Sequence, residues 1–323
     1  MSVSDFRFGS PLNPSRLFLV CLALAALLLT ATKPVAAQEE DVLSLPGEDG
    51  AGSGALPPAI TRISLEPLTL SQGKTAVIRL KATPGITMSG SLAGRKLNFF
   101  PLRDELVALQ GIYTMTEPGL YFLTLNINLP GSEPFAFSQA ILIRDSNYPF
   151  DPLLSVDPET FDPAVTVPED EQWQSLAAPV TPDKLWQGRF ESPVPAPFRD
   201  CWTSFFGNRR SYNGSPYNYF HSGLDFCGTT GTELYAAAAG EVVFAGPLTV
   251  RGNATMIDHG WGVYTAYDHQ SEIFVQAGDV VLPEQIIGLG GATGRTTGPH
   301  LHWEVWVGGV QVDPMDWLES SIP

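Results

Sequence analysis

Basic residues are scarce in this chain. Its 323 residues include 18 lysines and arginines against 34 acidic residues, a formal net charge of −16. Nucleic-acid binding needs clustered Lys and Arg to contact phosphates, and docking on an anionic membrane surface needs the same excess of positive charge. The composition therefore argues against both partners. It is typical of a soluble, acidic secreted protein, and the length favours about two domains.

Long hydrophobic runs are absent apart from one near the N-terminus. Arg7 and Arg16 precede the apolar run 17–29, and small residues follow at 35–37. This order of segments is the signature of a secretory signal, so residues 1–37 are predicted to be a cleaved signal peptide. The run is short for a bilayer span, which takes about 20 residues. No stable membrane insertion is expected after cleavage, and an uncleaved anchor is the alternative.

Cysteine is limited to three residues, and Cys21 lies inside the predicted signal, in surroundings unlike a lipid-attachment site. The mature chain would keep Cys201 and Cys227. An even pair in an oxidising compartment favours a disulfide. Two buried free thiols, or Cys227 as a metal ligand, are the alternatives.

Strand patterns begin after a leader. Residues 38–57 are rich in Gly, Glu and Asp, which predicts a flexible segment. Within 58–146, short apolar runs alternate with polar residues, as Leu123, Leu125 and Ile127 do, and this period is that of half-buried strands. Turn signals separate the runs at sandwich-like spacing. The pattern predicts a β-sandwich of about seven strands.

The segment 147–186 differs in composition from its neighbours. It lacks basic residues up to Lys184, whereas Asp, Glu and Pro are frequent. Like charges repel, so an extended, solvated acidic Pro-rich linker is predicted. A short helix over 168–176, introduced by Pro168 at its first turn, is the one element expected within it.

The last part, 187–320, is rich in glycine and β-branched residues. Short apolar runs of strand-like composition recur between Gly-containing turns, at 241–245, 255–257, 263–267, 273–275 and 301–307. Few stretches could form a long helix, so an antiparallel β domain is predicted. A nucleotide-binding loop is not evident, because Gly288 and Gly290 lack the rest of a dinucleotide fingerprint.

Histidine is absent from the first 220 residues, and all five histidines lie between positions 221 and 302. Two patterns contain metal-ligand residues, one with His221 and Asp225 and one with His300 and His302. Histidine and carboxylate are common zinc ligands, and a catalytic zinc needs three protein ligands and an open fourth position. If the chain performs chemistry, this last third is predicted to perform it.

Spacing allows these residues to share a site. In a strand, side chains two positions apart point to one face about 6.6 Å apart, so His300 and His302 would face one cleft. His221 and Asp225 would lie about 13 Å apart in a regular strand. The chain must therefore bend between them, and Gly223 offers the backbone freedom.

Three further residues belong to the same argument. His269 is predicted to stand at a strand end, on the face of Tyr267, where it can reach the cleft. Glu304 follows on the His300 face and is a candidate acceptor that orients a ligand imidazole, with a solvated strand residue as the equal alternative. His259 precedes a turn and is predicted to be structural.

Together, His-Ser-Gly-Leu-Asp at 221–225, Asp-His-Gly-Trp-Gly at 258–262, Tyr-Asp-His at 267–269 and the stretch 291–304, which ends in His-Leu-His-Trp-Glu, resemble the lysostaphin-type (M23, LytM-like) zinc metallopeptidases of cell walls. The resemblance covers roughly residues 186–318. The β module and linker before it resemble, more loosely, family members with an immunoglobulin-like domain ahead of the peptidase. The implied fold is all-β, an immunoglobulin-like sandwich followed by an antiparallel M23 domain.

The resemblance implies a peptidoglycan endopeptidase, periplasmic or extracellular and associated with the cell wall, that cuts stem peptides or cross-bridges. By motif, His221, Asp225 and His302 would hold one Zn²⁺ per chain, and His269 and His300 would be the catalytic pair beside the metal-bound water. Zinc lowers the pKa of such a water to about 7. Either flanking histidine could be the general base.

Some relatives use a tyrosine upstream of the first ligand to assist the oxyanion, and Tyr212, Tyr217 and Tyr219 are equal candidates. Others are held inactive by a preceding segment that covers the zinc, a role open to the stretch before Phe205. The alternative function is a non-catalytic LytM-type module that binds the wall or regulates a wall amidase. Such modules typically lack ligands, whereas this chain has the full set, which favours the enzyme. The sequence does not indicate an oligomeric state.

Overall fold

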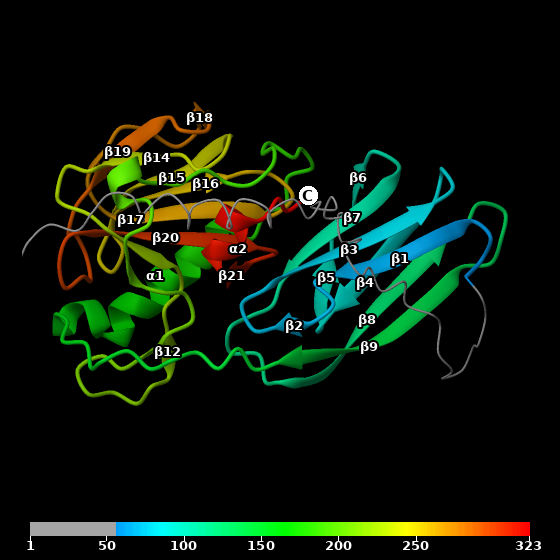
Figure 1. The fold of residues 1–323 in the computed structure, drawn as a ribbon, viewed down its shortest axis with the longest axis horizontal. Coiled ribbons are helices and arrows are strands. Elements are labelled where there is room, and N and C mark those ends of the chain that lie inside the picture. Colours follow the sequence, from blue (N-terminus) through cyan, green and yellow to red (C-terminus); the bar gives the residue numbers. More distant parts are fainter. Residues whose placement is uncertain (1–55) are drawn as a thin grey trace, which may run out of the picture. The chain divides into compact units, whose positions relative to one another are not determined.

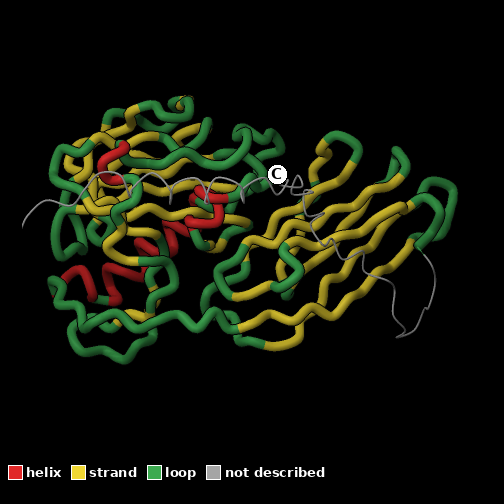
Figure 2. The backbone as a smooth tube through the Cα atoms, viewed as in Figure 1, coloured by secondary structure: helices red, strands yellow, loops and turns green. Residues whose placement is uncertain are grey.

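The computed structural model describes residues 56–323. The predicted signal peptide and all but the end of the predicted leader lie outside the described residues. Within them the chain is mostly β, with strands in two regions and a mixed segment between the two (Figures 1 and 2). Two α-helices make the fold mostly β rather than all-β. In the part that the structure describes, no helix is long and apolar enough to span a bilayer.

The first region contains nine short strands: β1 (Ile60–Glu66), β2 (Leu70–Ser71), β3 (Thr75–Ala82), β4 (Thr87–Leu92), β5 (Arg95–Leu97), β6 (Phe100–Leu102), β7 (Glu105–Gly111), β8 (Gly119–Asn128) and β9 (Phe135–Arg144). They form one sheet in the order β1-β3-β7-β6 and another in the order β2-β9-β8-β4-β5. There are more strands than the pattern predicts, because β2, β5 and β6 are too short to show alternation.

Alternation along β8 explains how these two sheets share a core. Leu123, Leu125 and Ile127 are buried at 0–1 % exposure, whereas Phe122 on the opposite face is 59 % exposed. The buried face packs in one cluster with Ile78 and other residues of the β1-β3-β7-β6 sheet. Each such buried side chain stabilises the fold by roughly 1.5–3 kcal/mol.

The segment after β9 contains a 3₁₀ turn (Pro158–Phe161), helix α1 (Pro163–Leu176) and a second 3₁₀ turn (Ala196–Phe198). Helix α1 begins five residues before the predicted position and has Pro168 in its interior. The Asp162 side chain caps it by accepting from the backbone N–H of Ala164 at 2.8 Å, and Pro163 occupies the first turn, where a missing N–H costs nothing.

Helix α1 is packed, so the prediction of an extended, solvated linker is wrong. Trp173 is fully buried and Glu169 is 7 % exposed. The Glu169 carboxylate accepts hydrogen bonds from the backbone N–H groups of Thr249, Val250 and Arg251 at 2.8–3.0 Å. Those bonds offset the cost of desolvating the buried carboxylate. The packing of the helix therefore outweighs the repulsion between like charges that the composition of the segment suggests.

The last region contains strands β10 (Trp202–Ser204), β11 (Arg209–Arg210), β12 (Tyr219–Phe220), β13 (Leu224–Cys227), β14 (Glu233–Tyr235), β15 (Gly240–Leu248), β16 (Gly252–Asp258), β17 (Val263–Ile273), β18 (Val280–Val281), β19 (Ile286–Gly290), β20 (His300–Val307) and β21 (Val310–Val312), then helix α2 (Pro314–Glu319). Ten of these strands form one sheet, with the path β10-β13-β20-β17-β16-β15-β18. The strand pairs along this path are antiparallel, as predicted.

Candidate metal centre

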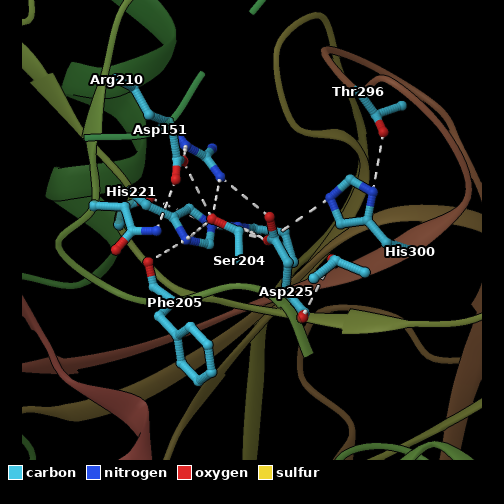
Figure 3. Close-up of polar contacts among 12 residues, drawn as sticks. Asp151, Ser204, Phe205, Arg210, His221, Asp225, Thr296 and His300 are labelled. Carbon is cyan, nitrogen blue, oxygen red and sulfur yellow. Dashed lines mark hydrogen bonds and ion pairs between the residues drawn. The ribbon is translucent and has the colours of Figure 1, made fainter. Parts of the chain in front are cut away.

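Neighbouring strands bring three predicted ligands together. Asp225 on β13 lies directly opposite His302 on β20 in the antiparallel ladder, and His221 stands just before β13. Oδ1 of Asp225 is 2.8 Å from both His221 Nε2 and His302 Nδ1, and the two nitrogens are 2.9 Å apart. The structure thus gathers residues that are distant in sequence around one point (Figure 3).

The chain reaches this arrangement because His221 precedes the strand. Gly223 stands between the two ligands of the first motif, where the backbone passes close to β20. A Cβ atom there would lie 2.4 Å from the carbonyl oxygen of Trp303 and 2.9 Å from the His302 ring. Glycine is required here by close approach of the strands.

Hydrogen bonds fix which nitrogen of each ligand imidazole carries the proton. His221 Nδ1 is 2.8 Å from the Phe205 carbonyl oxygen, which can only accept, so Nδ1–H donates and Nε2 presents a lone pair. His302 Nε2 is 3.3 Å from Oε1 of Glu304, so in the neutral ring Nε2–H donates and Nδ1 presents a lone pair. Two nitrogen lone pairs and one Asp225 oxygen therefore converge.

Converging lone pairs repel one another unless a cation lies between them. Zinc ligands at about 2.1 Å in tetrahedral geometry stand about 3.4 Å apart, so the three atoms, separated by 2.8–2.9 Å, would move apart by about 0.5 Å to hold zinc. His221, Asp225 and His302 are 0 %, 5 % and 7 % exposed, respectively. The donor set and its burial fit a metal ion such as zinc, whose preferred ligands are imidazole and carboxylate.

The protonation of the ligands depends on what occupies the site. Desolvation lowers the pKa of His221 to about 4, which keeps that ring neutral. For His302, desolvation acts against the charged form, but hydrogen bonds to Asp225 and Glu304 prevail and raise its pKa to about 10.

The two predicted catalytic histidines face the same cluster. His269 Nδ1 donates to the Thr293 carbonyl at 2.7 Å, and His300 Nδ1 donates to the Gly298 carbonyl at 2.8 Å. Each neutral ring is thereby left with a lone pair on Nε2. The His300 Nε2 atom is 3.7 Å from Oδ1 of Asp225. The ring centroids of His269 and His300 are 4.8 Å apart. Figure 3 shows His300 turned toward Asp225.

His269 reaches the cluster by a different route from the one that alternation suggests. It lies inside β17 rather than at its end, and its φ of 63° is in the left-handed region. Asp268 and His269 consequently line the same hollow, although successive side chains of a regular strand point to opposite faces. The predicted placement on the Tyr267 face is therefore wrong.

Glu304 contacts a ligand imidazole, as its position on β20 suggests. It is 1 % exposed; its Oε2 accepts from the indole N–H of Trp306 at 2.8 Å and of Trp173 at 3.1 Å. Burial acts against the charge of Glu304, but the hydrogen bond from His302 and that ring's charge lower the pKa of this carboxyl to about 2. A carboxylate held in this way fixes the His302 ring.

Comparison with known proteins identifies this part of the chain. Residues 219–314 match the model of peptidase family M23. The chain contains an M23 domain.

Two curated relatives share that domain. The DD-carboxypeptidase/endopeptidase Mpg of Neisseria meningitidis is 44 % identical over 95 residues, 29 % of this chain and 22 % of Mpg. The peptidoglycan DD-endopeptidase ShyB of Vibrio cholerae is 37 % identical over 131 residues, 41 % of this chain and 30 % of ShyB. The chain thus matches less than a third of the length of either relative.

One solved structure is similar over a larger part of the chain. A crystal structure described as a peptidase M23 from Pseudomonas aeruginosa superposes with a TM-score of 0.59 and 25 % sequence identity, and the match covers 77 % of this chain and 94 % of that one. The aligned part of this chain is longer than the stretch from residue 219 to the C-terminus. The likeness therefore extends into the regions before residue 219.

The contacts that join Asp151 and Arg210 to Asp225 have no signal in the sequence. Arg210 donates from Nη2 to Oδ2 of Asp225 and from Nε to Oδ2 of Asp151, both at 3.2 Å. Asp151 also accepts from Asn208 at 2.7 Å. The acidic segment before the domain therefore reaches the ligand Asp225 through one arginine, as the dashed lines in Figure 3 show.

Part of the stretch before Phe205 lies beside the site. Phe150 and Leu154 form parallel bridges with Arg209 and Tyr212. Leu154 and Val156 then line a hollow of about 120 Å³, together with His269 and His300.

Of the tyrosines proposed to assist the oxyanion, Tyr212 is the one that lines this hollow. Tyr217 donates its hydroxyl to the Asp151 carbonyl at 2.9 Å. Tyr219 lines an adjoining hollow instead. The geometry separates candidates that the sequence leaves equal.

Cys201 and Cys227 form a disulfide in this structure, which takes the Cys227 sulfur out of consideration as a metal ligand. Cys227 lies opposite His300 in the ladder. His259 is fully buried and bonds to the Ala239 carbonyl and the Thr265 hydroxyl, both at 2.8 Å. These contacts lie away from the ligand cluster and give His259 a structural role.

Proposed function

We propose that this chain is a secreted zinc metalloendopeptidase that hydrolyses peptide bonds of peptidoglycan, in stem peptides or cross-bridges. The observation that carries the proposal is the convergence of His221, Asp225 and His302, with two further histidines presenting free Nε2 atoms beside them. Relatives of the M23 domain are named as enzymes that act on peptidoglycan.

In this proposal His221, Asp225 and His302 hold the zinc ion. When bound, zinc would polarise the scissile carbonyl and lower the pKa of a water ligand. Asp225 balances part of the ion's charge, and Glu304 keeps the His302 ring in the tautomer that binds metal.

His269 and His300 are proposed to move protons. Their Nδ1 atoms are engaged by backbone carbonyls, so each can accept a proton only at Nε2. Desolvation and the neighbouring rings hold the pKa of His269 well below its ordinary value. A neutral acceptor is therefore present at physiological pH, as general base catalysis requires.

The domain organisation follows from the same proposal. Residues 1–37 are a signal peptide and 38–57 a leader, 58–146 an immunoglobulin-like sandwich, 147–186 a connecting segment and 187–320 the M23 domain. The location is the cell envelope, outside the cytoplasm. The disulfide between Cys201 and Cys227 supports an oxidising compartment.

Metal analysis combined with wall digestion tests the function. The purified protein, loaded with zinc, is incubated with peptidoglycan sacculi, and the released fragments are identified by mass spectrometry. We expect about one zinc per chain and new amino termini at peptide bonds. Protein that binds one zinc but releases no fragments, including after truncation to a start just upstream of Asp162, would instead support a non-catalytic module that binds the wall or regulates an amidase.

A further inference from the structure

Three arginines line the hollow beside the metal centre, Arg210, Arg251 and Arg295. They are notable in a chain with only 18 basic residues and a net charge of −16. Whether they attract a negatively charged ligand depends on how much of their charge is already balanced within the protein.

Two of the three arginines are paired with carboxylates. Arg210 contacts Asp151 and Asp225 at 3.2 Å. Arg251 contacts Glu169 at 3.1 Å and Asp170 at 2.9 Å. Each guanidinium therefore faces two carboxylates. The role of these two arginines is to hold protein side chains in place.

Arg295 has no ion pair with any residue of 56–323. Its Nη1 donates to the Thr160 carbonyl at 3.2 Å, and its guanidinium lies over the Tyr212 ring, 4.6 Å from the centroid. A guanidinium has five N–H donors in a planar fork. Both contacts position the group but leave most of its donors, and all of its charge, available.

The carboxylates that line the hollow do not compensate this charge. Asp225 is occupied by two histidines and Arg210, and Glu304 by two indoles and His302. Asp268 is buried at 2 % exposure and pairs with His302 across the ladder, and it forms no ion pair with Arg295. The hollow thus offers one uncompensated positive charge.

Arg295 is also well placed and held. Its backbone N–H donates to the Val250 carbonyl at 2.7 Å, and it belongs to the loop that leads into His300 at the start of β20. It lines both the hollow with the catalytic histidines and the adjoining one with Tyr219. A ligand that extends from the metal centre between the two hollows would pass it.

We propose that Arg295 binds a free carboxylate of the peptide substrate close to the scissile bond, so that the site selects a carboxylate-bearing peptide over the corresponding carboxamide. A planar guanidinium fork matches a carboxylate in two parallel hydrogen bonds. The inference rests on the proposed peptidase function and defines its substrate class. Arg295 is in this sense a specificity-determining residue.

The test uses two synthetic cross-linked wall peptides that differ only in one terminal group beside the cleaved bond, a carboxylate in one and a carboxamide in the other. Cleavage by the zinc-loaded full chain is compared for the unmodified protein, Arg295→Gln, Arg295→Lys and the control Arg199→Gln, an exposed arginine outside the hollow. Binding of both peptides to metal-free protein is measured by calorimetry as a readout independent of turnover.

We expect the unmodified protein and the control to favour the carboxylate peptide by about tenfold or more, the size of a charge-assisted hydrogen bond. Arg295→Gln should abolish this ratio, mainly through KM, and Arg295→Lys should retain part of it. Equal treatment of both peptides by the unmodified protein, or a ratio unchanged in Arg295→Gln, overturns the inference. If neither peptide is cleaved but binding still shows an Arg295-dependent preference, the function fails and the carboxylate site stands.

Discussion

The Arg210 guanidinium donates to one oxygen of Asp225 across 3.2 Å, while the other oxygen of that carboxylate faces His221 and His302 at 2.8 Å each. A carboxylate held at one oxygen is fixed in rotation about its side-chain bonds. Arg210 therefore directs a single Asp225 oxygen at the point where the imidazole lone pairs meet, and it does so without being a ligand itself.

Replacing Arg210 with methionine should weaken zinc binding by about 10- to 100-fold, the usual effect of losing a group that orients a ligand. The measurement is zinc affinity by competition with a chelating dye, and Arg199→Met is the matched control. Unchanged affinity in a folded Arg210→Met protein would show that Asp225 is held by its strand alone.

The two histidines of the His-Leu-His motif should separate metal binding from turnover. His302→Ala removes a ligand and is expected to lose both zinc and activity. His300→Ala should keep about one zinc per chain and lose about 10²- to 10⁴-fold in turnover, the range for a general acid or base. Zinc content is measured by atomic absorption, and cleavage of sacculi is measured on the same samples. Loss of zinc in His300→Ala would contradict the assignment of His300 as a residue that is not a ligand.

Residues 150–156 should limit access of large substrates. Leu154 and Val156 line the hollow, so the Leu154→Gly, Val156→Gly double variant is expected to raise kcat/KM for sacculi several-fold, with less effect on a small peptide. Leu153 is 65 % exposed and does not line the hollow, which makes Leu153→Gly the control. Equal rates in all three proteins would mean that this segment does not restrict entry.

Glu169 should be important for stability although it belongs to an acidic segment. Its buried carboxylate accepts three backbone N–H groups, and Glu169→Ala leaves them unpaired, at an expected cost of about 2–4 kcal/mol in the free energy of unfolding. Chemical denaturation monitored by tryptophan fluorescence gives the value. Glu171→Ala in the same helix, at an exposed position, should change it by less than about 0.5 kcal/mol.

The local parts of the site could be predicted from sequence, and the long-range parts could not. His221, Asp225 and His302 follow from two short motifs, and the strand register then brings them together. The contact between Trp173 and Glu304 joins residues 131 positions apart, and hydrophobic periodicity reports only which face of one element is buried. The periodicity does not indicate which distant side chain will reach that face.

Errors at two particular places have identifiable causes. Alternation predicts the wrong face for His269 because a positive φ interrupts the pattern of β17. Pro168 predicts a helix start five residues too late, whereas Asp162 followed by Pro163 is itself a start signal that the sequence shows. The first cause is invisible to pattern analysis, and the second could have been found.

The indole of Trp173 has a practical consequence for recombinant fragments that contain the M23 domain. A truncation designed from the family match alone would begin near residue 219 and discard helix α1, leaving Glu304 without one of its two indole donors. Fragments intended to fold and retain their metal should therefore start upstream of Asp162, whose side chain caps that helix.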